Sequence, residues 1–480
     1  MEEKKGNIRV RFAPSPTGYL HVGSLRTALY NYLFAKKHGG MFILRIEDTD
    51  RSRLVEDAAE KLISVLNTMG LSYDEGPYVQ SERLDLYGKY AEELVEGGKA
   101  YRCFCTAERL EAMRAEQTAA KQMPKYDRTC LTLSPDEVKA KLDAGESHVI
   151  RMKIADDREI SFEDMVRGDV AFKTETIDDQ VLLKSDGFPT YHLANVVDDH
   201  LMGITHVIRA EEWLPSTPKH ILLYEAFGWD APEFAHLPLL LNPDRSKLSK
   251  RQGDVAVEDY LAKGYLPEAL INFVALLGWN PGEGSTQEIF SLDELTRQFD
   301  LSNVHKAGAV FDLGKLDWMN AEYIKRLSVD ELYERSKPFF DAAEQDEALM
   351  KRVLAVEQDR LAKLSDVGKE NPFFFSHPSA EVSMLPWKKS SADGAVTELA
   401  RAVDILSKVS DTEWTREKLG EILLEAAGEK RGDFLWPLRV ALSGKEKSPP
   451  PQDIAWVIGK ESTLLRIRSA QESLSGKATK

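Results

Sequence analysis

The sequence predicts an α/β protein with a parallel sheet in its N-terminal half and a helical C-terminal half. A strand, a helix and a second strand follow one another within about 40 residues near the N-terminus, α/β patterning returns near residue 190, and helical patterns dominate from about residue 255. A strand, helix and strand in this order form a βαβ unit, which has parallel strands and a right-handed crossover.

The first βαβ unit is predicted from three consecutive patterns. Apolar residues alternate in "IRVRF" (8–12), as is typical of a strand, and recur at helical spacing over 25–33. The segment "MFILRI" (41–46) is typical of a buried strand. Because open α/β sheets bind ligands beyond the carboxyl ends of their strands, we expect a ligand at "PSPTGYLHVGS" (14–24), between the first strand and the first helix.

The remaining chain is predicted segment by segment. Residues 54–100 are predicted to be mainly helical. Residues 101–190 have a mixed pattern, with the strand candidates "HVIRMKI" and "DVAFKTE" and all three cysteines, and are predicted to form an insertion. A helix followed by a strand fits 189–213, and mainly helices are expected from 255 onward.

Composition narrows the class of protein. At 480 residues, with 42% hydrophobic and 30% charged residues, the chain is long enough for roughly two to four globular domains. Its start lacks the features of a signal or transit peptide, and no apolar run reaches the roughly 20 residues that cross a bilayer, so we expect a cytoplasmic protein without a membrane partner. The net charge of −16 argues against indiscriminate nucleic-acid binding, although basic stretches such as 244–251 leave room for local phosphate-binding surfaces.

The tetrapeptide "HVGS", from His21 to Ser24, stands at the predicted start of the first helix. Free amide groups and the helix dipole favour an anion at such a place, and Gly23 has no side chain to block a close approach of a nucleotide. His21 would add a hydrogen bond to a phosphate. These residues alone leave open the alternative of an ordinary loop.

A second candidate is the basic stretch "NPDRSKLSKRQGD" (242–254). Lys247, Lys250 and Arg251 alternate there with small residues, which suits a loop that closes on a triphosphate. The alternative is a solvated basic loop. The presence of both stretches in one chain favours nucleotide binding.

These two stretches resemble the signature motifs of the class I aminoacyl-tRNA synthetases, "HVGS" the HIGH motif and "KLSKR" the KMSKS motif. The surrounding segments resemble bacterial glutamyl-tRNA synthetases over nearly the whole chain, among them "RFAPSPTGYLHVG", "FILRIEDTDR", "DEGPYVQSER", "PTYHLANVVDDH" and "YLPEALINFVALLGW". Glutaminyl enzymes carry Glu and Asn where Ser15 and Thr17 stand. Ser24 and Arg251 depart from the two signatures, but both occur among glutamyl enzymes.

The resemblance implies a particular division into domains. A Rossmann-type parallel-sheet catalytic domain would be formed by residues 1–100 and 191–254, with an inserted α+β acceptor-binding domain over 101–190. An all-α stem-contact domain over 255–325 and an all-α anticodon-binding domain over 326–480 would follow.

The resemblance also implies the reaction. L-glutamate would be activated with ATP to glutamyl-adenylate, and then transferred to the 3'-terminal adenosine of tRNA(Glu); whether tRNA(Gln) is also an acceptor stays open. Mg²⁺ would accompany ATP without a dedicated protein cage. Family members generally need tRNA to activate glutamate and are usually monomers.

Family positions assign roles to individual residues. His21, Gly23, Lys247 and Lys250 would be catalytic, with the two lysines neutralising charge as the α-phosphate is attacked. The implied ATP-binding set is Pro14, Ser15, His21, Gly23, Ser24, Glu212, Trp213, Lys247, Leu248, Ser249, Lys250 and Arg251.

The implied glutamate-binding set is Arg11, Ser15, Glu47, Tyr191, Asn195 and Arg209. Arginine suits a carboxylate because its planar fork can bind both oxygens. Arg11, Tyr191 and Arg209 would therefore read the carboxylates, and Glu47 would pair with the ammonium group. The residues alone leave open a surface ion-pair run around Glu47 and a core position for Tyr191.

Cys103, Cys105, Tyr126 and Cys130 resemble a zinc site found in some members of the family. Thr132 stands where some glutamyl enzymes carry a histidine ligand. The alternative is three inert thiols.

Three other functions explain the sequence less well. A nucleotidyltransferase would explain "HVGS" but neither "KLSKR" nor the helical C-terminal region. A tRNA-binding paralogue without catalysis is disfavoured because His21, Lys247 and Lys250 are all present. A shortened relative that modifies a tRNA base lacks the anticodon domain.

Overall fold

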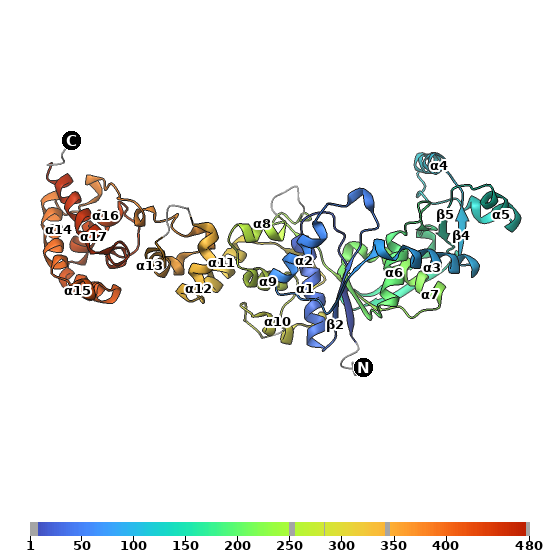
Figure 1. Cartoon of the computed structure of the whole chain (residues 1–480), viewed down its shortest axis with the longest axis horizontal. Helices are drawn as coiled ribbons and strands as arrows, with labels where there is room; N and C mark the ends of the chain where they lie inside the picture. Colours follow the sequence, from blue (N-terminus) through green and yellow to red (C-terminus); the bar gives the residue numbers. More distant parts are fainter. Residues whose placement is uncertain (1–7, 249–254, 283, 341–345, 477–480) are drawn as a thin grey trace. The chain divides into compact units, whose positions relative to one another are not determined.

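The computed structural model describes residues 8–248, 255–282, 284–340 and 346–476. The chain divides into two compact units, one of Met1–Tyr260 with Leu270–Leu313 and one of Leu261–Ala269 with Gly314–Lys480. Figure 1 shows strands and helices together in the first unit and a cluster of helices at the C-terminal end of the second. This confirms the predicted change from α/β to helical structure.

The first unit is built on two groups of strands that lie side by side. One group is a parallel sheet in the order β1 (Arg9–Phe12), β2 (Met41–Ile46), β3 (Glu75–Val79). The other has the order β7 (Gly168–Lys173), β6 (Glu159–Asp164), β10 (Glu233–Leu237), β9 (His206–Ala210). Strands β6, β10 and β9 are parallel, and β7 is antiparallel to β6.

Arg9 joins the two groups. Its carbonyl accepts from the amide of Thr205, and its amide donates to the Thr205 hydroxyl, both at 2.9 Å. Strand β1 therefore lies beside β9, and the carboxyl ends of β1, β2 and β9 face the same edge.

Helices follow these strands as the patterns predict. The helices of this part are α1 (Val22–Lys37), α2 (Ala58–Thr68), α3 (Leu84–Glu96), α6 (Tyr191–Leu201) and α7 (Thr217–Phe227). The predicted unit of β1, α1 and β2 is confirmed, and so is the succession of α6 and β9. Apolar residues of α6, such as Leu193, Val196 and Val197, are completely buried in the core around it.

Strand β3 differs from the prediction of mainly helical structure over 54–100. Its sequence, "EGPYV", has no run of alternating apolar residues, and its residues are exposed or half-buried, so the usual strand signal is missing. It lies at the sheet edge, where Pro77 is tolerated because an edge strand needs fewer backbone donors.

Residues 101–190 do not form one separate body. Strands β4 (Ala100–Cys103), β5 (Val149–Met152) and β8 (Val181–Leu183) form an antiparallel sheet with α4 (Ala107–Ala119) and α5 (Pro135–Asp143) nearby (Figure 1). Strands β6 and β7, from the same stretch of sequence, extend the parallel sheet beside β10 instead. Asp164 thereby comes to lie opposite Phe234.

The chain after residue 255 is mainly helical, as predicted. Its helices are α8 (Val257–Ala262), α9 (Pro267–Ala275), α10 (Leu292–Gln298), α11 (Leu313–Ile324), α12 (Val329–Ser336), α13 (Glu347–Glu357), α14 (Ala392–Ser407), α15 (Arg416–Ala427), α16 (Arg431–Ser443) and α17 (Pro451–Leu474). Strand β12 (Ala309–Val310) is a short strand in this part, and it pairs with β11 (Leu240–Leu241) from the chain before it. Leu399, Leu423, Leu438 and Ile454 are completely buried in the core that α14 to α17 share. Among the described residues, no helix is both long and apolar enough to cross a bilayer.

Candidate active site

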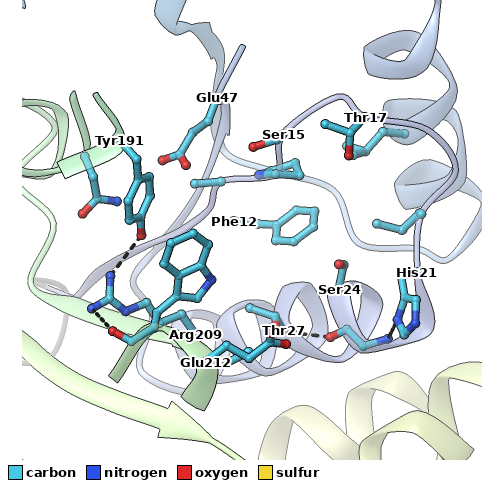
Figure 2. Close-up of a pocket in the computed structure, with 18 of the residues that line it drawn as sticks. Phe12, Ser15, Thr17, His21, Ser24, Thr27, Glu47, Tyr191, Arg209 and Glu212 are labelled. Atoms are coloured by element: carbon cyan, nitrogen blue, oxygen red, sulfur yellow. Dashed lines mark hydrogen bonds between the residues drawn. The ribbon is translucent and has the colours of Figure 1, made fainter. Parts of the chain in front are cut away.

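A cleft of about 810 Å³ opens beyond the carboxyl ends of β1, β2 and β9. Every described residue predicted to bind ATP or glutamate lines this cleft. Ser249, Lys250 and Arg251 lie outside the described residues. Figure 2 shows Glu47, Tyr191 and Arg209 on one side and the start of α1, with His21 and Ser24, on the other.

His21 caps the start of α1. Its Nδ1 accepts from the amide of Gly23 at 2.9 Å, and its carbonyl accepts from the amides of Ser24 and Leu25 (Figure 2 draws the first bond). The expectation of free amide groups at this helix start is therefore wrong. Because Nδ1 is an acceptor, the ring proton lies on Nε2, which gives His21 a donor suited to a phosphate oxygen.

The two signature stretches meet at the cleft. Lys247 and Leu248 are the described residues of the "KLSKR" stretch, and the amide of Leu248 donates to the carbonyl of Leu240 at 2.9 Å. Beyond the stretch, the carbonyl of Val255 accepts from the amide of Val22, inside "HVGS", also at 2.9 Å. Backbone hydrogen bonds thus tie the chain after the second stretch to the first.

Lys247 and Glu212, two predicted ATP-binding residues, form an ion pair. Lys247 Nζ lies 2.8 Å from Glu212 Oε2, and about half of each side chain is exposed. Exposed pairs of this kind contribute little to stability, about 0–1 kcal/mol. The lysine can therefore exchange the carboxylate for a phosphate at low cost.

A buried ion cluster forms the floor beneath the predicted glutamate site. Arg11 donates to both oxygens of Asp199, at 3.1 and 3.3 Å. Arg45 donates to Asp199 at 2.7 Å and to Glu47 at 3.0 Å, and it is completely buried. The alternative of a surface ion-pair run around Glu47 is therefore wrong.

Burial and the arginines act in opposite directions on these carboxylates. Burial by itself would raise the pKa of Asp199, but Arg11 and Arg45 outweigh it and hold that pKa below its ordinary value. Burial raises the pKa of Glu47 despite the neighbouring Arg45. Asp199 is thus firmly ionised, whereas Glu47 gains from a further cation, such as a ligand ammonium.

The acidic pair Asp198 and Asp199 has a role in the site that was not predicted from the sequence. Asp198, also buried, accepts from Gln80, Arg83 and Tyr87 at 2.8 to 3.0 Å. A signal was present: two adjacent acids stand in an apolar helix pattern, and arginines stand inside two strand patterns. Buried charges of opposite sign need one another.

Arg209 has a different environment from Arg11. Its guanidinium donates to two histidine nitrogens, His220 Nδ1 at 3.3 Å and His236 Nε2 at 3.1 Å. It also donates to three oxygens: Tyr191 Oη at 3.0 Å, Thr217 Oγ1 at 3.0 Å and the carbonyl of Trp213 at 3.4 Å. The Tyr191 ring lines the cleft, half-buried, with its centroid 4.4 Å from that of Trp213, so it is not a core residue. Because Tyr191 Oη accepts from Arg209, its own proton can be donated to a ligand.

Asn195 presents an unsatisfied donor in the same wall. The side chain is almost completely buried, and its Nδ2 has no hydrogen-bond partner among the described residues. Buried donors are rarely left unpaired. This donor fits an acceptor on a bound ligand.

The three cysteines lie together outside the cleft. The sulfur atoms of Cys103, Cys105 and Cys130 lie within 4.8 Å of one another, and Tyr126 Oη is 3.3 Å from the first two. Thr132 instead donates from its hydroxyl to the carbonyl of Thr129. Three sulfurs and one oxygen match the four ligands of a tetrahedral zinc site.

Two known protein families match this chain. Residues 7–318 match the family described as tRNA synthetases class I (E and Q), catalytic domain, and residues 331–471 match the anticodon binding domain. The chain belongs to the class I tRNA synthetases of the E and Q group. The first match contains the cleft, and the second contains the helical core of the C-terminal unit.

Individual members of this family are similar over almost their whole length. The glutamate–tRNA ligase of Chlorobaculum parvum is 50% identical, with 98% of each chain covered, and that of Chloroherpeton thalassium is 49% identical, with 97% of this chain and 98% of that one covered. The crystal structure of a glutamate tRNA ligase from Elizabethkingia meningosepticum in complex with its amino acid superposes with a TM-score of 0.87. It is 39% identical, and the match covers 98% of this chain and 100% of that one.

Proposed function

We infer that this chain charges tRNA with glutamate, using ATP. The observation that carries this inference is the cleft that the described residues of both signature stretches and all described glutamate-binding candidates line. One part of the cleft offers His21 and Lys247 to phosphates, and another offers Arg209 and Glu47 to a charged amino acid. A site for joining an amino acid to a nucleotide needs both parts side by side.

In the first step, an oxygen of the α-carboxylate of glutamate attacks the α-phosphorus of ATP, and pyrophosphate leaves. Arg209 and Tyr191 bind a carboxylate of glutamate, and Glu47 accepts from its ammonium group. Lys247, together with Lys250, neutralises the charge that develops on the phosphates. Mg²⁺ comes with ATP, as is general in this family.

In the second step, a hydroxyl of the 3'-terminal ribose of tRNA attacks the carbonyl carbon of the adenylate, and AMP leaves. We propose tRNA(Glu) as the acceptor, with tRNA(Gln) as a second acceptor to be tested. The C-terminal region that matches an anticodon binding domain supports recognition of the tRNA. A monomeric state and a cytoplasmic location remain predictions from the sequence.

We propose in addition that Cys103, Cys105, Cys130 and Tyr126 hold a zinc ion. The donor set fits, because three sulfurs and an oxygen converge within ligand range of one another. Such an ion would cross-link β4 to the chain around Cys130 and take no part in the reaction.

The function is tested by glutamate-dependent exchange of pyrophosphate into ATP, with and without tRNA. Exchange that appears only when tRNA is added, together with acid-stable transfer of labelled glutamate to tRNA(Glu), is the expected result. Exchange with a different amino acid, or none under either condition, would contradict the proposal. Transfer to purified tRNA(Gln) in the same assay decides the range of acceptors.

A further inference from the structure

Arg209 lies in the wall of the cleft, and no carboxylate of the described residues pairs with it. It is 4% exposed, and all five of its N–H groups have acceptors, each of them an uncharged group. Arg11 is equally buried, but both its hydrogen bonds go to the carboxylate of Asp199. The two arginines of the glutamate site therefore differ in whether their charge is balanced.

Two histidines hold Arg209 from different elements. His220, in the first turn of α7, accepts at Nδ1, and its Nε2 lies 3.1 Å from Nδ1 of His192. His236, on β10, accepts at Nε2, and its Nδ1 lies 2.6 Å from Oδ2 of Asp164. Because one ring accepts at Nδ1 and the other at Nε2, the two rings are neutral and in opposite tautomers.

The surroundings keep these rings neutral. Burial, followed by the charge of Arg209, lowers the pKa of His220 well below its ordinary value. Burial also lowers the pKa of His236, although Asp164 acts in the opposite direction. Asp164 is separated from the guanidinium by the whole imidazole ring, so it orients the histidine without pairing with Arg209.

We propose that His220 and His236 are positioning residues that hold Arg209 through neutral acceptors and so keep its positive charge for a carboxylate of the substrate. This rests on the function inferred above. A carboxylate in place of either ring would hold the guanidinium equally well but would cancel its charge, as Asp199 does for Arg11. A neutral support thus favours the charged side chain of glutamate over the amide of glutamine.

His220 permits a test in which only charge changes. Asn and Asp both place an oxygen near the position of Nδ1, and both are accepted in the first turn of a helix. The charged or titratable groups that face His220 are Arg209, Arg11, His192, His236 and the Tyr191 ring, whose centroid is 5.5 Å from that of His220. An aspartate there would face cations and neutral rings and would be ionised.

The measurement is steady-state charging of tRNA(Glu) by the full chain, with glutamate varied. Both variants should bind glutamate less well than the wild type, but H220D should have a KM for glutamate at least about tenfold above that of H220N. The values of kcat and the KM for ATP should differ much less between the two, because the carboxylate contact is made in the ground state and the transition state alike. His377→Asp, at an exposed histidine of the C-terminal unit, controls for the added charge.

Equal KM values for glutamate in H220N and H220D would overturn the proposal. If the wild type itself does not charge tRNA with glutamate, the proposed function fails instead, so the two failures are distinguishable.

A second measurement, on the wild type alone, tests the proposal even if a variant does not fold. Histidine side-chain ¹⁵N spectra at pH 7 should show His220 protonated on Nε2 and His236 on Nδ1, and an imidazolium at either position would also overturn the proposal.

Discussion

His21 has a structural and a chemical role at the start of α1. Its Nδ1 caps the helix through the amide of Gly23, which leaves the ring proton on Nε2. The cap therefore determines which nitrogen can donate to a phosphate. The amide of Gly23 thus holds His21 in the tautomer that can donate to a phosphate.

Gly23→Ala should disturb this cap more than the fold. A methyl group at position 23 would lie 3.1 Å from Nδ1 and 3.5 Å from Cε1 of His21, so the ring must shift. We expect the adenylation rate to fall at least about tenfold. The free energy of unfolding should change less, because the higher helix propensity of alanine, about 1 kcal/mol, offsets much of the stabilisation lost with the cap. Rates of pyrophosphate exchange and urea unfolding measure the two effects.

Gly88→Ala is the matched control for this variant. Gly88 lies inside α3, and a methyl group there would meet no atom within 4 Å. It should raise stability by about 0.5–1 kcal/mol without slowing adenylation. A Gly23→Ala enzyme as fast as this control would contradict the role given to the His21 cap.

Lys247→Ala should slow adenylation by about 100-fold, as is typical when one charge-stabilising donor is removed. Glu212→Gln breaks the same ion pair but leaves the lysine, so it should cost far less. Single-turnover formation of the adenylate in the presence of tRNA measures both. Similar losses in the two variants would mean that the ion pair matters, rather than contact of the lysine with phosphate. Lys250, outside the described residues, is predicted to behave like Lys247.

At the scale of elements, β1, β2 and α6 are joined by buried charge. Arg11 comes from β1, Arg45 from β2 and Asp199 from the end of α6, and all three are almost completely buried. Strands and helix are thus held in register by an ion cluster directly below the cleft. Removing one partner of such a cluster leaves another buried charge unpaired.

Asp199→Asn should destabilise the chain by about 3–5 kcal/mol at pH 7, the usual cost of breaking a buried pair. The folded state lowers the pKa of Asp199, so its contribution is complete above the unfolded value near 4 and is lost as pH falls through the folded pKa. The difference from the wild type in urea unfolding should therefore shrink below about pH 4. Asp404→Asn, which breaks an exposed pair with Lys408, should cost less than about 1 kcal/mol. Equal costs for the two variants would contradict the cluster's role.

The cysteine cluster lies between elements in the same way, joining β4 to the chain around Cys130. We expect about one zinc ion per purified chain by elemental analysis, and removal by a chelator should lower the melting temperature reversibly. Cys105→Ser should lose the ion, whereas Tyr126→Phe, which keeps three thiolates, should bind it more weakly. A chain without zinc whose stability does not change when zinc is added would contradict the site.

At the scale of the whole molecule, neutral histidines inside the fold make stability depend on pH: His220 and His236 are buried, and His192 is half-buried. Burial lowers the pKa of His192 to about 3, and those of His220 and His236 are also lowered. Below about pH 6.5 these histidines therefore bind protons in the unfolded chain but stay neutral in the folded chain. The contribution of these histidines to stability is therefore complete above about pH 6.5 and is lost as pH falls toward their folded pKa values.

His192→Gln should flatten this dependence by roughly 1 kcal/mol per pH unit between pH 6.5 and 5. Free energies of urea unfolding at a series of pH values give the slope. His377→Gln, at an exposed position, serves as the control and should leave the slope as it is in the wild type. An unchanged slope in His192→Gln would show that this histidine is protonated equally in both states.

Local patterns accounted for most elements, and the resemblance to a known family supplied the candidate residues of the cleft. The alternation of "IRVRF", the apolar run "MFILRI" and the helical spacing between them predicted β1, β2 and α1, because these periods are set by the backbone geometry of each element. Strand β3 was missed because an exposed edge strand has no apolar period. The ATP-binding and glutamate-binding candidates were implied by the family resemblance, and all described members line one cleft.

The sequence by itself thus determined the fold class, the order of the main elements and, through its resemblance to a known family, the candidate residues that line the cleft. Only the tertiary structure decided how the charges are paired: Arg11 meets Asp199 188 residues away, and Asp164 meets His236 across 72 residues. Such pairs depend on strand order, here the place of β6 beside β10, which no local period encodes. For this reason the balanced charge of Arg11 and the unbalanced charge of Arg209 became visible only in the folded molecule.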